Sequence, residues 1–347
     1  MTSFHRLSRV GAALTLVAGL AVASSAQAAE PAPLGVGTVR TVASGFSLPW
    51  SLAFLPDQSA LVSERDSFNI IRVTPQGAKT TIGKVSGVSG TGGEGGLLGL
   101  AVSPNFASDH WLYVYHTSSS DNRIVRIKYE NNKLGTKETL VTGIPRSRFH
   151  NGGRITFGPD GNLYAGTGDA ENTSNAQNRN SLGGKILRVT PAGQPAPGNP
   201  FGNRVYSYGH RNVQGLAFDS RGRLWASELG ASSRDELNLI RPGGNYGWPN
   251  CEGPCDDSRF INPVRTWSVA DASPSGLEIV DDVAYMACLR GQRMFEMRIT
   301  GDSTGSPRTH FRGTYGRLRS VERTSSGDIW LTTSNGSNDR ILHVDLT

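Results

Sequence analysis

A histidine and an aspartate lie 19 residues apart in a segment whose pattern predicts two strands joined by a tight turn. His150 opens the segment "HNGGRITFGPDGNLYAGTGD", and Asp169 closes it. Because a hairpin brings the two outer ends of its strands side by side, the carboxylate can orient the imidazole and make it more basic. The pair therefore predicts a general base that works near neutral pH.

A second set of polar residues is rich in positive charge. His210, Arg211 and Asn212 stand directly before an apolar strand in "GHRNVQGLAF", and Arg317 and Arg319 occupy the same place before the last strand repeat in "YGRLRSV". Arginine binds planar carboxylates through two parallel hydrogen bonds. If these residues converge, they predict an anionic ligand, whereas each arginine alone could be an ordinary loop residue.

Acidic residues and glycine-rich backbone gather in "SELGASSRDELNLIRPGGNYGWPN", which contains Glu228, Asp235 and Glu236. Carboxylates and backbone carbonyl groups are the ligands that Ca²⁺ prefers. The spacing is not that of an EF-hand loop, so a calcium site and a set of solvated loop acids both remain open.

The segment "GTGGEGG" matches the glycine spacing of dinucleotide-binding loops at Gly90, Gly92 and Gly95. An apolar strand follows it instead of the helix that such a loop requires, so the dinucleotide interpretation fails. The segment is better interpreted as a glycine loop that presents Glu94.

Six similar segments must position all of these residues. Each consists of an apolar strand, a tight turn and a second apolar strand; the copies begin at Pro49, Leu97, Gly152, Val213, Pro274 and Leu318. A repeat of about 40 to 50 residues with several strands is typical of a propeller. The sequence predicts an all-β, six-bladed β-propeller of four-stranded antiparallel blades, with a strand in "VGTVRTVAS" completing the last blade.

The amino terminus has the features of a secretory signal peptide. Basic residues precede a short apolar stretch and the small-residue segment "SSAQAA". We expect residues 1–28 to be the signal peptide, 29–37 a flexible leader and 38–347 one propeller domain, which predicts a secreted or periplasmic protein. No later stretch is apolar enough to span a membrane. The net charge of +6 comes without basic runs and does not suggest nucleic acid binding.

Cysteine usage agrees with export. Cys251 and Cys255 are four positions apart with Gly and Pro between them, which predicts a small disulfide loop in an oxidising compartment. Cys288 lies in an apolar strand and is expected to be a buried free thiol.

Six motifs, in order along most of the chain, resemble those of the soluble aldose sugar dehydrogenases that depend on pyrroloquinoline quinone (PQQ), the glucose/sorbosone dehydrogenase family. They are "LPWSLAFLPD", "GEGGLLGLAVSPNF", "HNGGRITFGPDGNLY", "GHRNVQGLAF", "DELNLIRPGGNYGWP" and "RLRSV". The resemblance implies that His150 takes the proton from the anomeric hydroxyl of the sugar, that Asp169 supports it, and that Arg211 lies beside the reacting quinone oxygens.

The same resemblance implies the other ligands. The implied cofactor contacts are Glu94, Arg211, Asn212, Asp235, Arg290, Arg317, Arg319 and Trp267. Calcium held with the cofactor would bind the carbonyl groups of Gly230 and Ala231, and a structural calcium would bind the Glu236 carboxylate and the Tyr246 carbonyl. The chain departs from the pattern at Leu229, where a polar residue can contact the cofactor in relatives.

These features predict an exported quinoprotein that oxidises the C1 hydroxyl of aldose sugars to lactones. No haem motif is present in the sequence, so the electrons would pass to an external acceptor. Two alternatives remain: a calcium-dependent propeller lactonase or other hydrolase, and a non-catalytic propeller that binds a glycan or a protein. The sugar, the natural acceptor and the oligomeric state are left open by the sequence.

Overall fold

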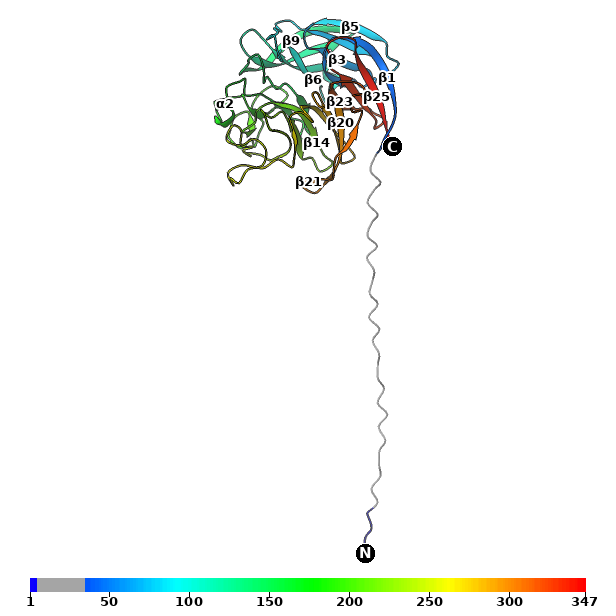
Figure 1. Cartoon of the computed structure of the whole chain (residues 1–347), viewed down its shortest axis with the longest axis vertical. Coiled ribbons are helices and arrows are strands. Elements are labelled where there is room, and N and C mark those ends of the chain that lie inside the picture. The colour runs from blue at the N-terminus through cyan, green and yellow to red at the C-terminus, as the bar shows by residue number, and fades with distance from the viewer. Residues whose placement is uncertain (5–34) are drawn as a thin grey trace. The chain divides into compact units, whose positions relative to one another are not determined.

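Six antiparallel sheets surround a common axis in residues 35–347, as the repeats predict (Figure 1). The computed structural model describes residues 1–4 and 35–347. The expected signal peptide and leader therefore fall almost entirely outside the described residues. β1 (Val36–Phe46) begins just inside the stretch that was expected to be leader.

Each of the six repeats supplies the first strand of one blade. Those strands are β2 (Pro49–Phe54), β6 (Leu97–Val102), β10 (Ile155–Phe157), β14 (Val213–Phe218), β18 (Pro274–Val280) and β23 (Leu318–Arg323). They contact one another in this order, and β23 contacts β2, so the ring is closed. Several are almost wholly buried along their length, because neighbouring blades cover both of their faces.

The remaining strands complete the blades in chain order. Blades one to three contain β3 (Ala60–Glu64), β4 (Asn69–Val73), β5 (Lys79–Lys84), β7 (Trp111–Thr117), β8 (Asn122–Glu130), β9 (Lys133–Ile144), β11 (Leu163–Gly166), β12 (Lys185–Val189) and β13 (Val205–Tyr208). Blades four to six contain β15 (Leu224–Glu228), β16 (Arg234–Ile240), β17 (Arg265–Ser268), β19 (Val283–Cys288), β20 (Arg293–Thr300), β21 (Ser303–Thr304), β22 (Arg308–His310), β24 (Ile329–Thr333) and β25 (Asp339–Leu346). Two short helices, α1 (Phe106–Asp109) and α2 (Ser174–Gln177), lie in connections.

The ring is closed by strands from the two ends of the described chain. β1 pairs antiparallel with β25, which confirms that the segment "VGTVRTVAS" completes the last blade. Hydrophobic clusters fill the spaces between blades, with Trp50 and Trp225 among the largest fully buried side chains. Closure of this kind leaves few free sheet edges.

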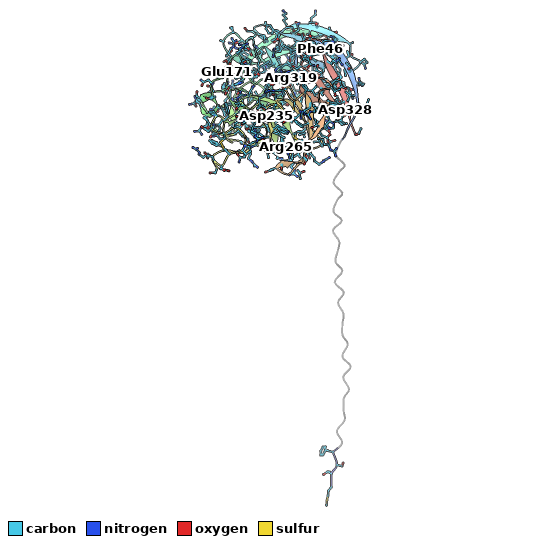
Figure 2. The ribbon with its side chains drawn as sticks, viewed as in Figure 1. Phe46, Glu171, Asp235, Arg265, Arg319 and Asp328 are labelled. Atoms are coloured by element: carbon cyan, nitrogen blue, oxygen red, sulfur yellow. A yellow bond between two sulfur atoms is a disulfide. The ribbon has the colours of Figure 1, made fainter. Side chains whose placement is uncertain are left out.

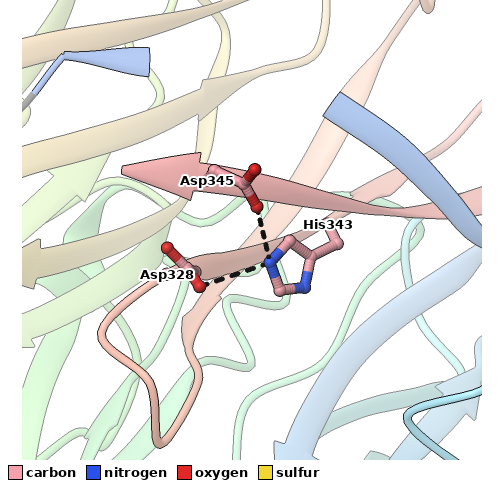
Figure 3. Close-up of side chains that lie close together, drawn as sticks. All are labelled: Asp328, His343 and Asp345. Carbon is pink, nitrogen blue, oxygen red and sulfur yellow. Dashed lines mark ion pairs between the residues drawn. The ribbon is translucent and has the colours of Figure 1, made fainter. Parts of the chain in front are cut away.

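A polar cluster supports the closure (Figure 3). His343 Nε2 lies 3.0 Å from an Asp345 carboxylate oxygen and 3.3 Å from an Asp328 carboxylate oxygen. The other ring nitrogen, Nδ1, accepts hydrogen bonds from Trp330 Nε1 at 3.1 Å and from Arg40 Nη2 at 3.2 Å. Indole and guanidinium nitrogens only donate, so Nδ1 must be the acceptor and Nε2 must carry the proton. A protonated Nε2 cannot bind a metal, and the cluster therefore joins β1 to β25 as a structural feature.

The cysteine predictions are confirmed. Cys251 and Cys255 form a disulfide, and Cys288 is a buried free thiol. Among the described residues, no helix is long and apolar enough to cross a membrane.

Candidate active site

The predicted histidine–aspartate pair forms at the edge of blade three. β10 and β11 pair as a hairpin, and His150 Nδ1 lies 2.8 Å from Asp169 Oδ1. The Asp169 side chain is 1% exposed and that of His150 is 19% exposed, so the carboxylate is sealed and the imidazole is accessible. Burial alone would raise the pKa of Asp169, but hydrogen bonds from His150 and Trp248 lower it overall.

The backbone holds His150 in an unusual conformation. Its φ is 55°, in the left-handed region that is uncommon for residues other than glycine. The His150 carbonyl accepts a hydrogen bond from the Ala170 amide at 3.1 Å. A Cβ atom added to Gly168 would lie only 1.9 Å from the oxygen of this carbonyl. Only glycine at position 168 allows this close approach of the two backbone segments.

Arg211 determines which nitrogen of His150 carries the proton. Arg211 Nη2 lies 2.8 Å from His150 Nε2, and a guanidinium can only donate. Nε2 must therefore hold a lone pair, and Nδ1 must donate its proton to Asp169. The hydrogen-bond network thus assigns the tautomer that a general base requires.

Glu94 and Asn212 join this pair to neighbouring blades. Glu94 Oε2 accepts from the His150 amide at 3.0 Å and from Asn212 Nδ2 at 3.2 Å. Asn212 Oδ1 accepts in turn from the Gly152 amide at 3.0 Å. The structure thus brings together three connections that lie between successive blades, as the sequence predicts.

Arginines gather in the central channel nearby. Arg319, labelled in Figure 2, is 6% exposed and donates to Ser334 Oγ and Gln214 Oε1, whereas Arg317 is exposed. Burial lowers the pKa of Arg319 to about 9, and Arg65 adds to this through charge repulsion. Among the described residues, no carboxylate lies within salt-bridge distance of Arg317 or Arg319, which leaves positive charge available for an anionic ligand.

A small cavity of about 10 Å³ lies behind Arg211 and is lined by Glu228, Glu236 and Tyr246. Glu228 and Glu236 face each other across β15 and β16. Burial, with the charge of Glu228 adding to it, raises the pKa of Glu236 to about 8. Asn238, which donates to Glu236, keeps a buried Oδ1 atom without a hydrogen-bond partner in the described chain. Clustered carboxylates around so small a space suit a single cation.

Glu252 organises the loop that contains Gly230 and Ala231. Its Oε1 atom accepts hydrogen bonds from four consecutive amides, at distances of 2.7 to 3.1 Å, in residues 231–234. These donors outweigh burial and lower the pKa of Glu252 to about 2. The loop then presents the Gly230 carbonyl to Arg211 Nη1 at 2.5 Å.

We expect Glu252→Ala to speed amide hydrogen exchange in residues 231–234 by at least about tenfold, because all four amides lose their acceptor. Exchange measured by mass spectrometry on the cofactor-free protein tests this. Glu138→Ala, which removes a carboxylate bound to Arg126 on another blade, serves as the control. Unchanged protection of residues 231–234 in Glu252→Ala would contradict the assignment.

Other residues predicted for the site are less closely connected to His150. Asp235 accepts from the amides of Gly230 at 2.9 Å and Ser273 at 2.6 Å, so it fixes loops. Trp267 is 9% exposed and stacks on Phe295 in a hydrophobic cluster. Arg290 is exposed in the turn after β19.

Three residues that support the candidate active site, Trp248, Arg65 and Glu252, were not predicted from the sequence. Trp248 Nε1 donates to Asp169 Oδ2 at 2.8 Å, and its ring lies 5.5 Å from the Arg211 guanidinium. Arg65 and Glu252 have the roles described above. The "GGNYGWP" motif contained Trp248, but nothing in its spacing to Asp169, 79 positions away, indicated contact.

Comparisons with known proteins agree with this geometry. The sequence profile described as Glucose / Sorbosone dehydrogenase matches residues 46–343. Quinoprotein glucose dehydrogenase B of Acinetobacter calcoaceticus is 33% identical over 285 residues, which cover 70% of this chain and 60% of that relative. Aldose sugar dehydrogenase YliI of Escherichia coli is 26% identical over 91% of this chain and 94% of its own length.

A solved structure is also similar. The PQQ-bound form of aldose sugar dehydrogenase from Streptomyces coelicolor has a TM-score of 0.89 and 51% identity, over 92% of this chain and all of that one. The profile match over most of the propeller, together with this likeness, shows that the chain belongs to the glucose/sorbosone dehydrogenase family.

Proposed function

We propose that this chain is an exported quinoprotein that oxidises the C1 hydroxyl of aldose sugars to lactones, with PQQ as its redox cofactor. The observation that carries the proposal is the chain of contacts from Asp169 through His150 to Arg211. It provides a base whose Nε2 lone pair accepts from Arg211 and lies beside a positively charged channel.

The residues present fit a cofactor that bears several carboxylates. Arg211 Nε is buried without a hydrogen-bond partner, which is costly unless a ligand supplies an acceptor. Arg211, Arg317 and Arg319 would hold the anionic cofactor, with Glu94 and Asn212 beside it. When bound, PQQ supplies a quinone that accepts the C1 hydrogen of the sugar as a hydride.

His150 performs the proton transfer in this proposal. Its Nε2 lone pair takes the proton of the C1 hydroxyl, and the hydroxyl displaces the Arg211 contact at that atom. Asp169 stabilises the imidazolium that forms, and Trp248 keeps the carboxylate oriented through its second oxygen. The Glu94 carboxylate and the left-handed backbone hold the imidazole in place during the reaction.

Calcium binding is part of the proposal. The Glu236 carboxylate and the Tyr246 carbonyl would hold a structural Ca²⁺, a role supported by the small acidic cavity and the unpaired Asn238 Oδ1. The carbonyl groups of Gly230 and Ala231 would bind the ion that accompanies the cofactor. Leu229 supplies no polar side chain there, although its carbonyl accepts from Arg211 at 3.2 Å.

We further propose export through the signal peptide at residues 1–28 and electron transfer to an external acceptor. The disulfide between Cys251 and Cys255 supports an oxidising compartment. Amino-terminal sequencing of the mature protein tests the cleavage site.

The function is tested by adding PQQ and Ca²⁺ to the purified protein and supplying a panel of aldoses with an artificial dye. We expect sugar-dependent dye reduction and a sugar-dependent change of the cofactor spectrum from quinone to quinol. Absence of dye reduction with every sugar would overturn the proposal. Lactone hydrolysis with Ca²⁺ and without PQQ would instead support the hydrolase alternative.

A further inference from the structure

The central channel has a second mouth, at the end of the ring opposite His150. A cavity of about 400 Å³ opens there, and residues from all six inner strands line it. Small-molecule sites generally occupy about 300 to 1,000 Å³. We call this cavity the far mouth; its lining includes Phe54, Phe157, Phe218, Glu278 and Glu322.

Arg154, Trp50 and Arg319 separate the far mouth from the candidate active site. The Arg154 and Arg319 guanidinium groups lie 4.6 and 5.6 Å from the centre of the Trp50 ring. All three side chains are almost completely buried. The far mouth is therefore a compartment of its own and not an extension of the cofactor channel.

Arg154 points to a ligand in this compartment. It is 3% exposed, and its Nε and Nη1 atoms donate to the Gln214 carbonyl at 2.9 Å and Ser51 Oγ at 3.2 Å. Its Nη2 atom is buried and has no partner in the described chain, although Arg154 lines the far mouth. A buried donor left without an acceptor is costly, so an acceptor from a ligand or water would satisfy it.

Two carboxyl groups supply acceptors in the same cavity. The Glu322 carboxyl group makes no hydrogen bond with any described residue, and the Glu278 carboxyl group accepts from the Ile279 amide at 3.1 Å. Burial raises the pKa of both groups, and for Glu322 the neighbouring Glu278 adds to the effect. The pair can therefore accept hydrogen bonds when ionised and can also donate when protonated.

Three aromatic rings complete the lining. Phe54, Phe157 and Phe218 end the inner strands β2, β10 and β14, so the repeat places them at equivalent positions around the axis. Each packs edge-on against an aromatic ring, Trp330, Tyr113 or Tyr164 respectively. These contacts hold the phenyl rings in fixed positions at the cavity wall.

We propose that the far mouth is a saccharide-binding site separate from the candidate active site. A sugar hydroxyl both donates and accepts, so it can satisfy the carboxyl groups and Arg154 Nη2 together, while the apolar face of the ring packs on phenylalanine. A bare divalent cation suits the site less well, because the Arg154 guanidinium faces the same carboxyl groups. The site does not depend on the proposed cofactor.

Methyl β-D-glucoside is the probe, because its blocked C1 hydroxyl prevents oxidation at the candidate active site. Titration calorimetry on the cofactor-free protein is expected to show saturable binding in the wild type and in His150→Asn. The double variant Glu278→Gln/Glu322→Gln is expected to weaken binding at least about tenfold, because each carboxyl group is replaced by an amide whose NH2 group cannot accept a hydrogen bond from the sugar.

A second variant, Thr156→Trp, should fill the far mouth from β10 without changing its carboxyl groups, and it should also abolish binding. Both variants should retain dye-linked aldose oxidation, which separates this inference from the proposed function. Thermal unfolding checks that they fold. The inference is overturned if the folded wild type binds no glycoside, if neither variant weakens binding, or if Ca²⁺ but not the glycoside binds there.

Discussion

Replacing His150 by asparagine is expected to lower kcat for aldose oxidation by about 10²- to 10⁴-fold, the contribution typical of a positioned general base. Asparagine tolerates the left-handed backbone at this position, so the loss reports the imidazole and not strain. Steady-state dye reduction by the protein loaded with PQQ and Ca²⁺ measures the effect. Quenching of tryptophan fluorescence by PQQ should show that the variant still binds the cofactor.

The matched control is His110→Asn. His110 also has a left-handed backbone, with φ of 52°, but it follows α1 at the opposite end of blade two. This variant carries the same side-chain change at nearly the same backbone angle, and we expect wild-type activity. Full activity in His150→Asn would show that another group is the base.

Replacing Asp169 by asparagine is expected to lower kcat by a similar factor, about 10²- to 10⁴-fold, while retaining cofactor binding. The Asp169 carboxylate accepts from three donors: His150 Nδ1 and the Glu171 amide at Oδ1, and Trp248 Nε1 at Oδ2. An asparagine has one acceptor oxygen, so its NH2 group must face either Trp248 or the side that holds His150 and the Glu171 amide. If the NH2 group faces His150, the imidazole must accept at Nδ1 and therefore adopts the tautomer with its proton on Nε2. The Nε2 atom then has no lone pair to take the proton of the sugar.

The pH dependence distinguishes this role from a simple loss of stability. Hydrogen bonds lower the pKa of Asp169 from its ordinary value of 3.8. Because the pKa of Asp169 is lower in the folded protein than in the unfolded chain, the ionised carboxylate stabilises the folded protein at pH values above the unfolded-state pKa. This stability is lost as the pH falls through the folded-state pKa. The carboxylate is therefore ionised throughout the range above about pH 5, since aspartate ordinarily titrates near 3.9. Any difference in stability between wild type and variant, measured by thermal unfolding, should therefore be constant there, so a rate ratio that varies with pH in this range reports the base and not stability.

Asp160→Asn is the control for this prediction. Asp160 lies in the turn between β10 and β11, in the same blade but at its far end, and binds Arg188, Asn162 and Tyr164. Its pKa is also lowered, so the variant matches the loss of a hydrogen-bonded carboxylate. A rate ratio for Asp169→Asn that equals the ratio for Asp160→Asn would contradict a specific role in orienting His150.

Local patterns accounted for the blades and for the pairing of His150 with Asp169. A strand, a tight turn and a second strand place the two outer ends together whatever the rest of the fold does. The same periodicity located all six inner strands, whereas closure by β1 and β25 was a prediction that no sequence pattern established and that the strand pairing confirms.

Contacts between side chains far apart along the chain could not be predicted from the sequence. Trp248 reaches Asp169 from another blade, and Glu252 gathers the amides of residues 231–234 from beyond β16. Neither pairing has a spacing rule, because the connections between strands set where each loop returns. The Asp328, His343 and Asp345 cluster likewise depends on the register of β24 and β25.

The sequence by itself determined the repeat, the hairpin pair and the positive charge at comparable strand ends, because these depend on short-range periodicity and residue type. Only the tertiary structure decided that Arg211 fixes the tautomer of His150, and that the channel is divided by Trp50 between two arginines. Both depend on side chains that meet across the axis of the ring. Their distances come from the packing of whole blades, which no local pattern encodes.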